Sequence, residues 1–199
     1  MGYSKFTKIE TVIKKFGLSA KREMLFTNII PFAPSEWLKT TLAKAKYIPL
    51  STEKAKSERI VSPILVEIAE LHQNLVTLFS GEELEINADE DLSGACDFLF
   101  VLSPQKPYLE NPIIAISAQK FMSESTAQCA AQLYGAKLFN EMEGKNIPVL
   151  YGCATDGVEW IFIRFENNMF HIDNKIYTDL KEILGVWHHI ISLYIEPKN

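Results

Sequence analysis

The chain has 199 residues, the length of a single domain or of two small ones. Hydrophobic residues make up 47% and charged residues 23%, and the mean hydropathy is near zero, which excludes a disordered chain, a collagen-like chain and a coiled coil. No apolar run approaches the roughly 18 residues of a membrane span, and the first residues lack the apolar core of a secretory signal. We therefore expect a cytoplasmic protein that does not contact a membrane.

The net charge of −5 is unevenly distributed along the chain. Residues 1–60 carry 12 Lys and Arg against five Asp and Glu, whereas residues 61–199 carry eight against 20. Residues 82–91 alone hold six acids and no base. The basic N-terminal part can serve as an arm for a polyanion such as DNA, or it can pack against the acidic remainder. The sequence leaves both interpretations open.

Helical patterns dominate the first third of the chain. Apolar residues at helical spacing predict a helix over 5–16 that ends at Gly17, followed by a loop over 18–34. Ser35 is a typical N-cap for a second helix over 35–46. A long helix then begins at Ser51 or Thr52, with Glu53 in its first turn, and continues to about Leu75.

The rest of the chain alternates strands and helices. We predict strands over 75–79, 95–102, 112–119, 148–154, 158–165 and 170–172, a proline-containing loop over 103–112, and helices over 123–143 and 178–194. The strand over 112–119 is apolar on both faces, which is typical of a central position in a sheet. We expect one α/β domain over 1–199, with a helical extension over 1–50 and a core over 51–199.

Cysteine and histidine give little indication of chemistry. Three widely spaced cysteines argue against a disulfide framework and against a zinc site built on thiolates. His188 and His189 are neighbours on a predicted helix, so their side chains point about 100° apart and are poorly placed to share one metal ion. We expect no cofactor from these residues.

Two acidic residues lie in apolar stretches. Glu67 falls at the edge of a helical stripe formed by Ile60, Ile64, Ile68, Leu71 and Leu75. Asp97 lies early in the strand over 95–102. A carboxylate in such surroundings needs a hydrogen-bond partner, an ion pair or a metal ion. Each of the two can be a functional group, or a structural one such as a salt-bridged edge residue or a turn cap.

The strand over 112–119 ends in polar residues. Because side chains alternate along a strand, Ser117 and Gln119 share one face, and Ala118 and Lys120 share the other. Polar residues at i and i+2 near the end of a buried strand are typical of a site at a sheet edge. The same pattern also arises where a strand simply leaves the core.

These residues stand in an order that resembles the PD-(D/E)XK nuclease superfamily, and within it uncharacterised cyanobacterial members. The matching segments are STEKAKSE (51–58), PILVE (63–67), SGEE (80–83), LSGACDF (92–98), QCAAQ (128–132), KLFNEMEG (137–144) and IPVLYGCATDGVEWIF (147–162). The resemblance covers roughly residues 35–195. It implies a restriction-endonuclease-like mixed β-sheet flanked by helices.

The resemblance also implies a site for phosphodiester cleavage. Asp97 matches the family's strand aspartate, Glu67 its helix acid and Gln128 its helix glutamine. In the family such carboxylates hold Mg²⁺ or Mn²⁺, which activates a water molecule, and a lysine stabilises the developing charge. Asp97 and Glu67 are thus the residues that would hold a Mg²⁺ ion.

This chain departs from the family at the strand motif. Where the family has Val-Glu-Ala-Lys, it has Ile116-Ser117-Ala118-Gln119, so a carboxylate and a cation are both replaced by neutral groups. Lys120 could supply a relocated cation, but it points to the opposite face unless the strand bulges. We expect a catalytically degenerate site.

Three functions remain open from the sequence. The first is a degenerate nuclease-like domain that binds nucleic acid or assembles with a partner, for instance as a homodimer. The second is an active Mg²⁺- or Mn²⁺-dependent nuclease that uses Glu67, Asp97 and Lys120. The third is a structural protein with no nucleic-acid role. Salt-dependent DNA binding would favour the first, and metal binding lost in Asp97→Ala the second.

Overall fold

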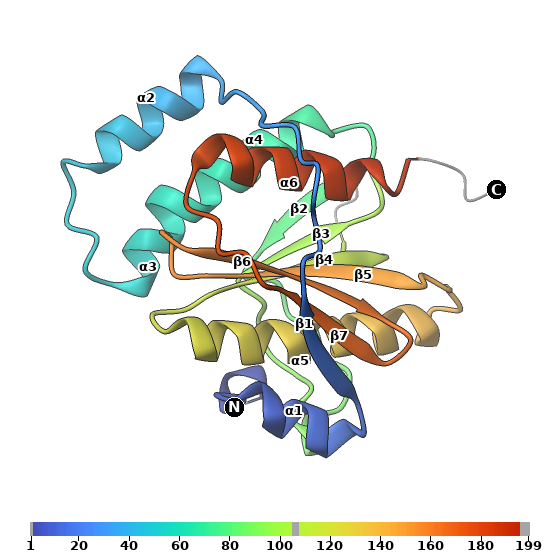
Figure 1. Cartoon of the computed structure of the whole chain (residues 1–199). Helices are drawn as coiled ribbons and strands as arrows, with labels where there is room; N and C mark the ends of the chain where they lie inside the picture. Colours follow the sequence, from blue (N-terminus) through green and yellow to red (C-terminus); the bar gives the residue numbers. More distant parts are fainter. Residues whose placement is uncertain (1, 105–107, 196–199) are drawn as a thin grey trace.

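A computed structural model describes residues 2–104 and 108–195, and it contains a seven-stranded mixed sheet with helices on both faces (Figure 1). The strands lie in the order β1-β7-β6-β5-β4-β3-β2. The predicted α/β class is therefore confirmed. Across the described ranges, no helix combines the length and the apolar character needed to span a membrane.

The elements follow one another in an order close to the predicted one. In chain order they are α1 (Ile9–Phe16), β1 (Ser19–Glu23), α2 (Glu36–Ala45), α3 (Glu53–Lys56), α4 (Ser62–Leu71), β2 (Thr77–Ser80), β3 (Phe98–Val101), β4 (Pro112–Ala118), α5 (Met122–Met142), β5 (Val149–Thr155), β6 (Trp160–Glu166), β7 (Met169–Asp173) and α6 (Leu180–Ser192). Short helical turns lie at Tyr3–Lys5, at Ser57–Val61 and at Ala88–Glu90. Within the expected loop over 103–112, residues 105–107 lie outside the described residues.

The middle of the sheet is the most deeply buried part of the molecule. All seven residues of β4 are buried, as expected for a central strand. Strands β2, β3 and β4 form an antiparallel meander. Helix α5 then crosses over, and β5 pairs in parallel with β4. A parallel pair needs such a crossover, because the chain has to return to the starting edge of the sheet.

Helices cover the two faces unequally. Figure 1 shows α5 on one face, with α1 packed beneath it, and α4 and α6 on the other face, with α2 next to α4. Helix α5 approaches β5 so closely that a Cβ atom at Gly152 would lie 2.6 Å from the Cys129 sulfur. A side chain at position 152 would therefore push α5 off the sheet.

Three helix boundaries follow the predicted capping residues. The Ser35 hydroxyl accepts a hydrogen bond from the Leu38 N–H at the start of α2. The Thr52 hydroxyl accepts one from the Ala55 N–H at the start of α3. Gly17 ends α1 in the left-handed conformation, with φ of 63°. These signals depend only on neighbouring residues, which is why the sequence alone reveals them.

The long helix predicted from Ser51 or Thr52 to Leu75 is interrupted and ends early. Ser57–Val61 form a π-helical turn between α3 and α4, and α4 ends at Leu71. Ile64 and Ile68 of the predicted stripe are buried, whereas Leu71, the last residue of α4, is 46% exposed. Glu67, expected at the edge of the stripe, is buried.

The predicted loop over 18–34 was wrong at its start. Ser19–Glu23 form β1, an edge strand that pairs in parallel with β7. This strand is mostly exposed and lacks the alternation of apolar residues on which strand prediction depends. The chain then passes to the opposite face, where the Phe32 N–H donates a hydrogen bond to the Lys181 carbonyl on α6. The region 1–50 thus also supplies a strand of the sheet.

Part of the N-terminal positive charge is used inside the molecule. The Lys5 and Lys15 ammonium groups both bind the Asp91 carboxylate, and Lys15 also donates a 2.6 Å hydrogen bond to the Glu90 carbonyl. The hydrogen bonds from Lys5 and then from Lys15 lower the pKa of Asp91 below its ordinary value. Two basic residues of the N-terminal part therefore pack against the acidic segment 82–91.

Candidate functional site

Asp97 meets the end of β4. It directly precedes β3, and its Oδ2 atom accepts hydrogen bonds from the Ala118 N–H at 2.8 Å and from the Gln119 side-chain amide at 3.1 Å. The antiparallel register, with Phe98 opposite Ile116, brings the start of β3 beside the end of β4. The two strand motifs identified in the sequence thus lie in direct contact.

The surroundings of Asp97 favour its protonated form. Burial raises the pKa of this carboxyl, the bonds from Ala118 and Gln119 oppose that rise, and the nearby Glu53 carboxylate adds to it. Hydrogen bonds from two neutral donors thus do not fully compensate the ionised Asp97 carboxylate for the hydration that it loses on burial. A lysine in place of Gln119 would instead lower the pKa of Asp97, because a positive charge stabilises the ionised form.

Asp97 faces a surface pocket between the sheet edge and the start of the long helical segment. Its wall on the helical side is formed by Glu53, Lys54, Ser57 and Glu58. The sheet side contributes Ser80 and Gly81 after β2, residues 95–97 before β3, and Ala118 and Gln119 at the end of β4. The pocket is therefore built from four segments that are far apart in the sequence.

Glu53 is a helix acid whose charge acts on the Asp97 carboxyl, and the sequence did not single it out as a site residue. It is the first residue of α3, directly after the Thr52 cap, and its Oε1 atom accepts a 3.2 Å hydrogen bond from the Lys120 N–H. Acids are common in the first turn of any helix, which hides a functional one. Its place in the matched segment STEKAKSE was the one available signal.

Glu67 lies in a different environment. Its side chain is buried between α4 and the start of α2, and it accepts hydrogen bonds from the Ser35 N–H at 2.7 Å and from the Ser35 hydroxyl. It does not line the pocket beside Asp97. Both carboxylate oxygens are thus occupied by the N-cap of α2, which is a structural arrangement.

Ser117, which the resemblance matches to a strand carboxylate, is fully buried. Ser117 points to the same face of β4 as Ala115. Ala115 pairs with Gly152 of β5, and a Cβ atom at Gly152 would point toward Cys129 on α5. The Ser117 carbonyl accepts a hydrogen bond from Ser125 on α5, and within the described ranges the Ser117 hydroxyl has no partner. Ser117 therefore lies beneath α5 and does not open to the pocket.

Lys120 and Gln128 are separated from the Asp97 carboxylate. Lys120 is exposed, and its ammonium group lies 5.3 Å from the centre of the Phe121 ring. Gln128 is 8% exposed on α5, one turn after Ser125. Neither side chain lines the pocket. Of the sequence-predicted site residues, the structure brings only Asp97 and Gln119 into contact through their side chains.

The donor set does not fit the divalent metal ion that the resemblance implies. Among residues 2–104 and 108–195, no group of three or more His, Cys, Asp and Glu side chains is placed to hold a metal ion. Asp97 already accepts two hydrogen bonds, and the neutral Ser117 lies beneath the helix. Mg²⁺ requires several oxygen ligands in octahedral geometry, which this arrangement does not supply.

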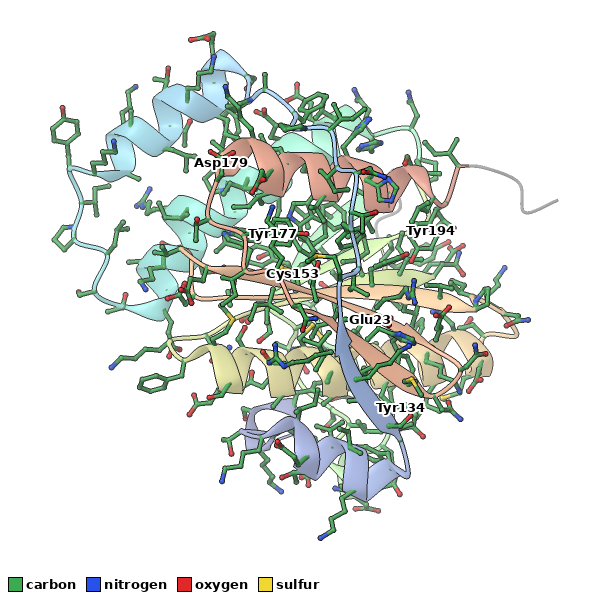
Figure 2. All side chains as sticks on the ribbon, viewed as in Figure 1. Glu23, Tyr134, Cys153, Tyr177, Asp179 and Tyr194 are labelled. Carbon is green, nitrogen blue, oxygen red and sulfur yellow. The ribbon has the colours of Figure 1, made fainter. Side chains whose placement is uncertain are left out.

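The cysteines are core residues. Cys96, Cys129 and Cys153 are all buried and unpaired, and Figure 2 shows Cys153 within the sheet at the centre of the molecule. Burial raises the pKa of Cys129 to about 12 and that of Cys153 well above its ordinary value. Since the thiolate is the reactive form, these two thiols are unsuited to nucleophilic chemistry.

Comparison of the chain with protein-family models, with curated proteins and with solved structures gave no match.

Proposed function

We propose that this chain is a PD-(D/E)XK-like domain that no longer hydrolyses phosphodiesters and that binds nucleic acid. The order of elements supports this fold: a helical segment precedes an antiparallel meander of β2, β3 and β4, and α5 leads to β5 in parallel with β4. A fold alone does not determine an activity, so the argument depends on the site.

The hydrogen bond between Gln119 and Asp97 carries the proposal. In the family's arrangement this aspartate binds a metal ion and the residue at position 119 is a cation. Here an amide donates directly to the carboxylate at 3.1 Å, and the second carboxylate position is a buried serine. The arrangement keeps the position of the site while removing metal ligands and positive charge. Loss of hydrolysis follows from that change.

Helix α2 and the connection from it to α3 offer a surface for nucleic acid. Lys44 and Lys46 are exposed near the end of α2, and between Lys46 and α3 the ring of Tyr47 is 88% exposed. Trp37, on α2 about two turns before Lys44, is 49% exposed. Lysines interleaved with exposed aromatic rings can bind phosphates and stack on unpaired bases. This combination favours single-stranded nucleic acid.

The first test is cleavage of plasmid and single-stranded DNA in Mg²⁺ and in Mn²⁺, with Asp97→Ala from the same preparation as control. We expect no cleavage above the control. Cleavage by the wild-type chain that disappears in Asp97→Ala would overturn the proposed loss of hydrolysis. It would favour the active nuclease that the sequence left open.

The second test measures binding of a fluorescent single-stranded oligonucleotide over a range of salt concentrations. We expect binding that weakens as salt rises, and further weakening in the double variant Lys44→Ala/Lys46→Ala. Lys137→Ala is the matched control, because Lys137 lies on α5 and pairs with Glu141. Binding that is equal in all three proteins, or absent from the wild-type chain, would contradict the nucleic-acid role.

A further inference from the structure

Two histidines meet at the opposite end of the segment that lines the pocket. His72 follows the last residue of α4, and His188 lies on α6. The Nε2 atom of His72 lies 3.1 Å from the Nδ1 atom of His188. His72 is 8% exposed, whereas His188 is open to solvent. The pair therefore joins two helices and can be reached from outside.

An aromatic ring packs against the pair. The Phe32 ring stacks on His188 with a centroid distance of 5.2 Å and an angle of 26° between the planes. The rings of His72 and His188 have centroids 5.0 Å apart. Among the described residues, no carboxylate binds either ring, so the imidazole nitrogens face each other without an acidic partner. His171 differs, because its Nδ1 atom lies 2.6 Å from Glu23.

We propose that His72 and His188 bind a first-row divalent transition metal ion such as Zn²⁺, Ni²⁺ or Cu²⁺. Two nitrogens at about 2.0–2.1 Å from one ion stand about 2.9 Å apart at a right angle and about 3.3 Å apart at the tetrahedral angle. The observed 3.1 Å separation lies within this range. An ion bound to both nitrogens would lie to one side of the line that joins them, so binding requires the rings to turn but little movement of either helix, and water would fill the remaining positions.

The protonation of the pair suits a metal ligand. Imidazole binds metal in its neutral form, and burial, followed by the neighbouring His188, lowers the pKa of His72. In the hydrogen-bonded pair, one of the two facing nitrogens carries a proton. On metal binding that proton moves to the other nitrogen of the same ring. Two neutral rings thus release no proton, and a pair that carries an extra proton releases one.

The expected consequence is a metal-dependent connection between α4 and α6. The ion would bind the folded chain, in which residues 72 and 188 are adjacent, far better than the unfolded chain. Ligands that bind only the folded state raise its stability. This inference is independent of the pocket beside Asp97 and of any nucleic-acid role, so the two proposals fail or succeed separately.

The test titrates the metal-free chain with NiCl₂ and with ZnCl₂, by calorimetry and by thermal unfolding. We expect one bound ion per chain and a rise in Tm of about 5–10 °C at roughly 100 times the Kd. His188→Ala should lose the rise, and since His188 is exposed this variant should fold normally. His189→Ala is the matched control on the same helix and should retain it. Equal metal affinity in the wild-type chain and in His188→Ala would overturn the proposal.

A spectroscopic measurement identifies the ligands directly. With one equivalent of Cu²⁺, electron paramagnetic resonance should show hyperfine coupling to two imidazole nitrogens in the wild-type chain and in His189→Ala. It should show coupling to fewer nitrogens in His188→Ala. A spectrum that does not change in His188→Ala would place the ion elsewhere, and the pair would then be a hydrogen bond only.

Discussion

Glu67 and Asp97 both lie among apolar residues, and their surroundings differ. Glu67 is covered by α2, and Ser35 donates to both of its oxygens. Asp97 is only partly covered, accepts bonds from Ala118 and Gln119 through one oxygen, and faces a pocket. Burial of an acid therefore does not distinguish a structural residue from a site residue. The distinguishing feature is an open side that a ligand can reach.

Glu67→Ala should be the most destabilising of the changes in this comparison. The substitution removes the acceptor of the Ser35 N–H and hydroxyl, empties the buried position of the Glu67 side chain and loosens the start of α2, at a cost of about 3 kcal/mol in the free energy of unfolding. Urea denaturation measures it. Glu67→Gln keeps one acceptor oxygen and should cost less. A loss below about 1 kcal/mol in Glu67→Ala would show that this carboxylate is not structural.

Asp97→Asn should change how the free energy of unfolding varies with pH more than it changes that free energy at neutral pH. The pKa of Asp97 is raised above its ordinary 3.8, so between those two values the folded chain holds more protons than the unfolded chain. Stability from this group is thus complete below pH 3.8 and falls as pH rises through the folded-state pKa. Asn removes that fall. At neutral pH we expect a change within about 1 kcal/mol.

Urea denaturation at a series of pH values between 4 and 7 checks this prediction. The wild-type chain should lose more stability than Asp97→Asn over the interval. Parallel pH profiles for the two proteins would mean that burial does not disfavour the charged form of Asp97. Electrostatics would then no longer distinguish the surroundings of Asp97 from those of Glu67.

Asp91→Asn should have the smallest effect, because Asp91 is a surface partner of Lys5 and Lys15. Its pKa is lowered, so the stability it contributes is present above its ordinary pKa of 3.8 and is lost as pH falls through the folded-state value. This sign is opposite to that of Asp97. Salt screens exposed pairs, so the Tm difference between wild type and Asp91→Asn should shrink between 50 mM and 1 M NaCl. A difference that is constant with salt would contradict the ion-pair explanation.

The elements that the sequence predicted best depend on local signals. The caps at Ser35 and Thr52 and the glycine end of α1 are set by residues within a few positions. The continuous apolar pattern of β4 likewise predicted a central strand. In contrast, β1 has no apolar alternation, and its pairing with β7 depends on residues about 150 positions away.

The candidate site was predictable only in part. Asp97 was identified because a charged residue in an apolar strand is visible in the sequence. The end of β4 was identified because polar residues follow its apolar run. The helix acid was not, because Glu53 lies in the first turn of a helix, where acids are common, and outside the apolar stripe that drew attention to Glu67. Which helix acid lines the pocket depends on how the helical segment packs against the sheet, and hydrophobic periodicity does not encode that packing.

The sequence by itself determined the α/β class, the order of most elements and the neutral polar residues Ser117 and Gln119 at the end of β4. Those properties follow from residue type and from spacing over a few positions. The tertiary structure alone decided that Ser117 lies beneath α5, that Ser35 donates hydrogen bonds to the Glu67 carboxylate, and that His72 contacts His188 across 116 positions. These contacts depend on the packing of whole elements against one another, and no local pattern encodes that packing.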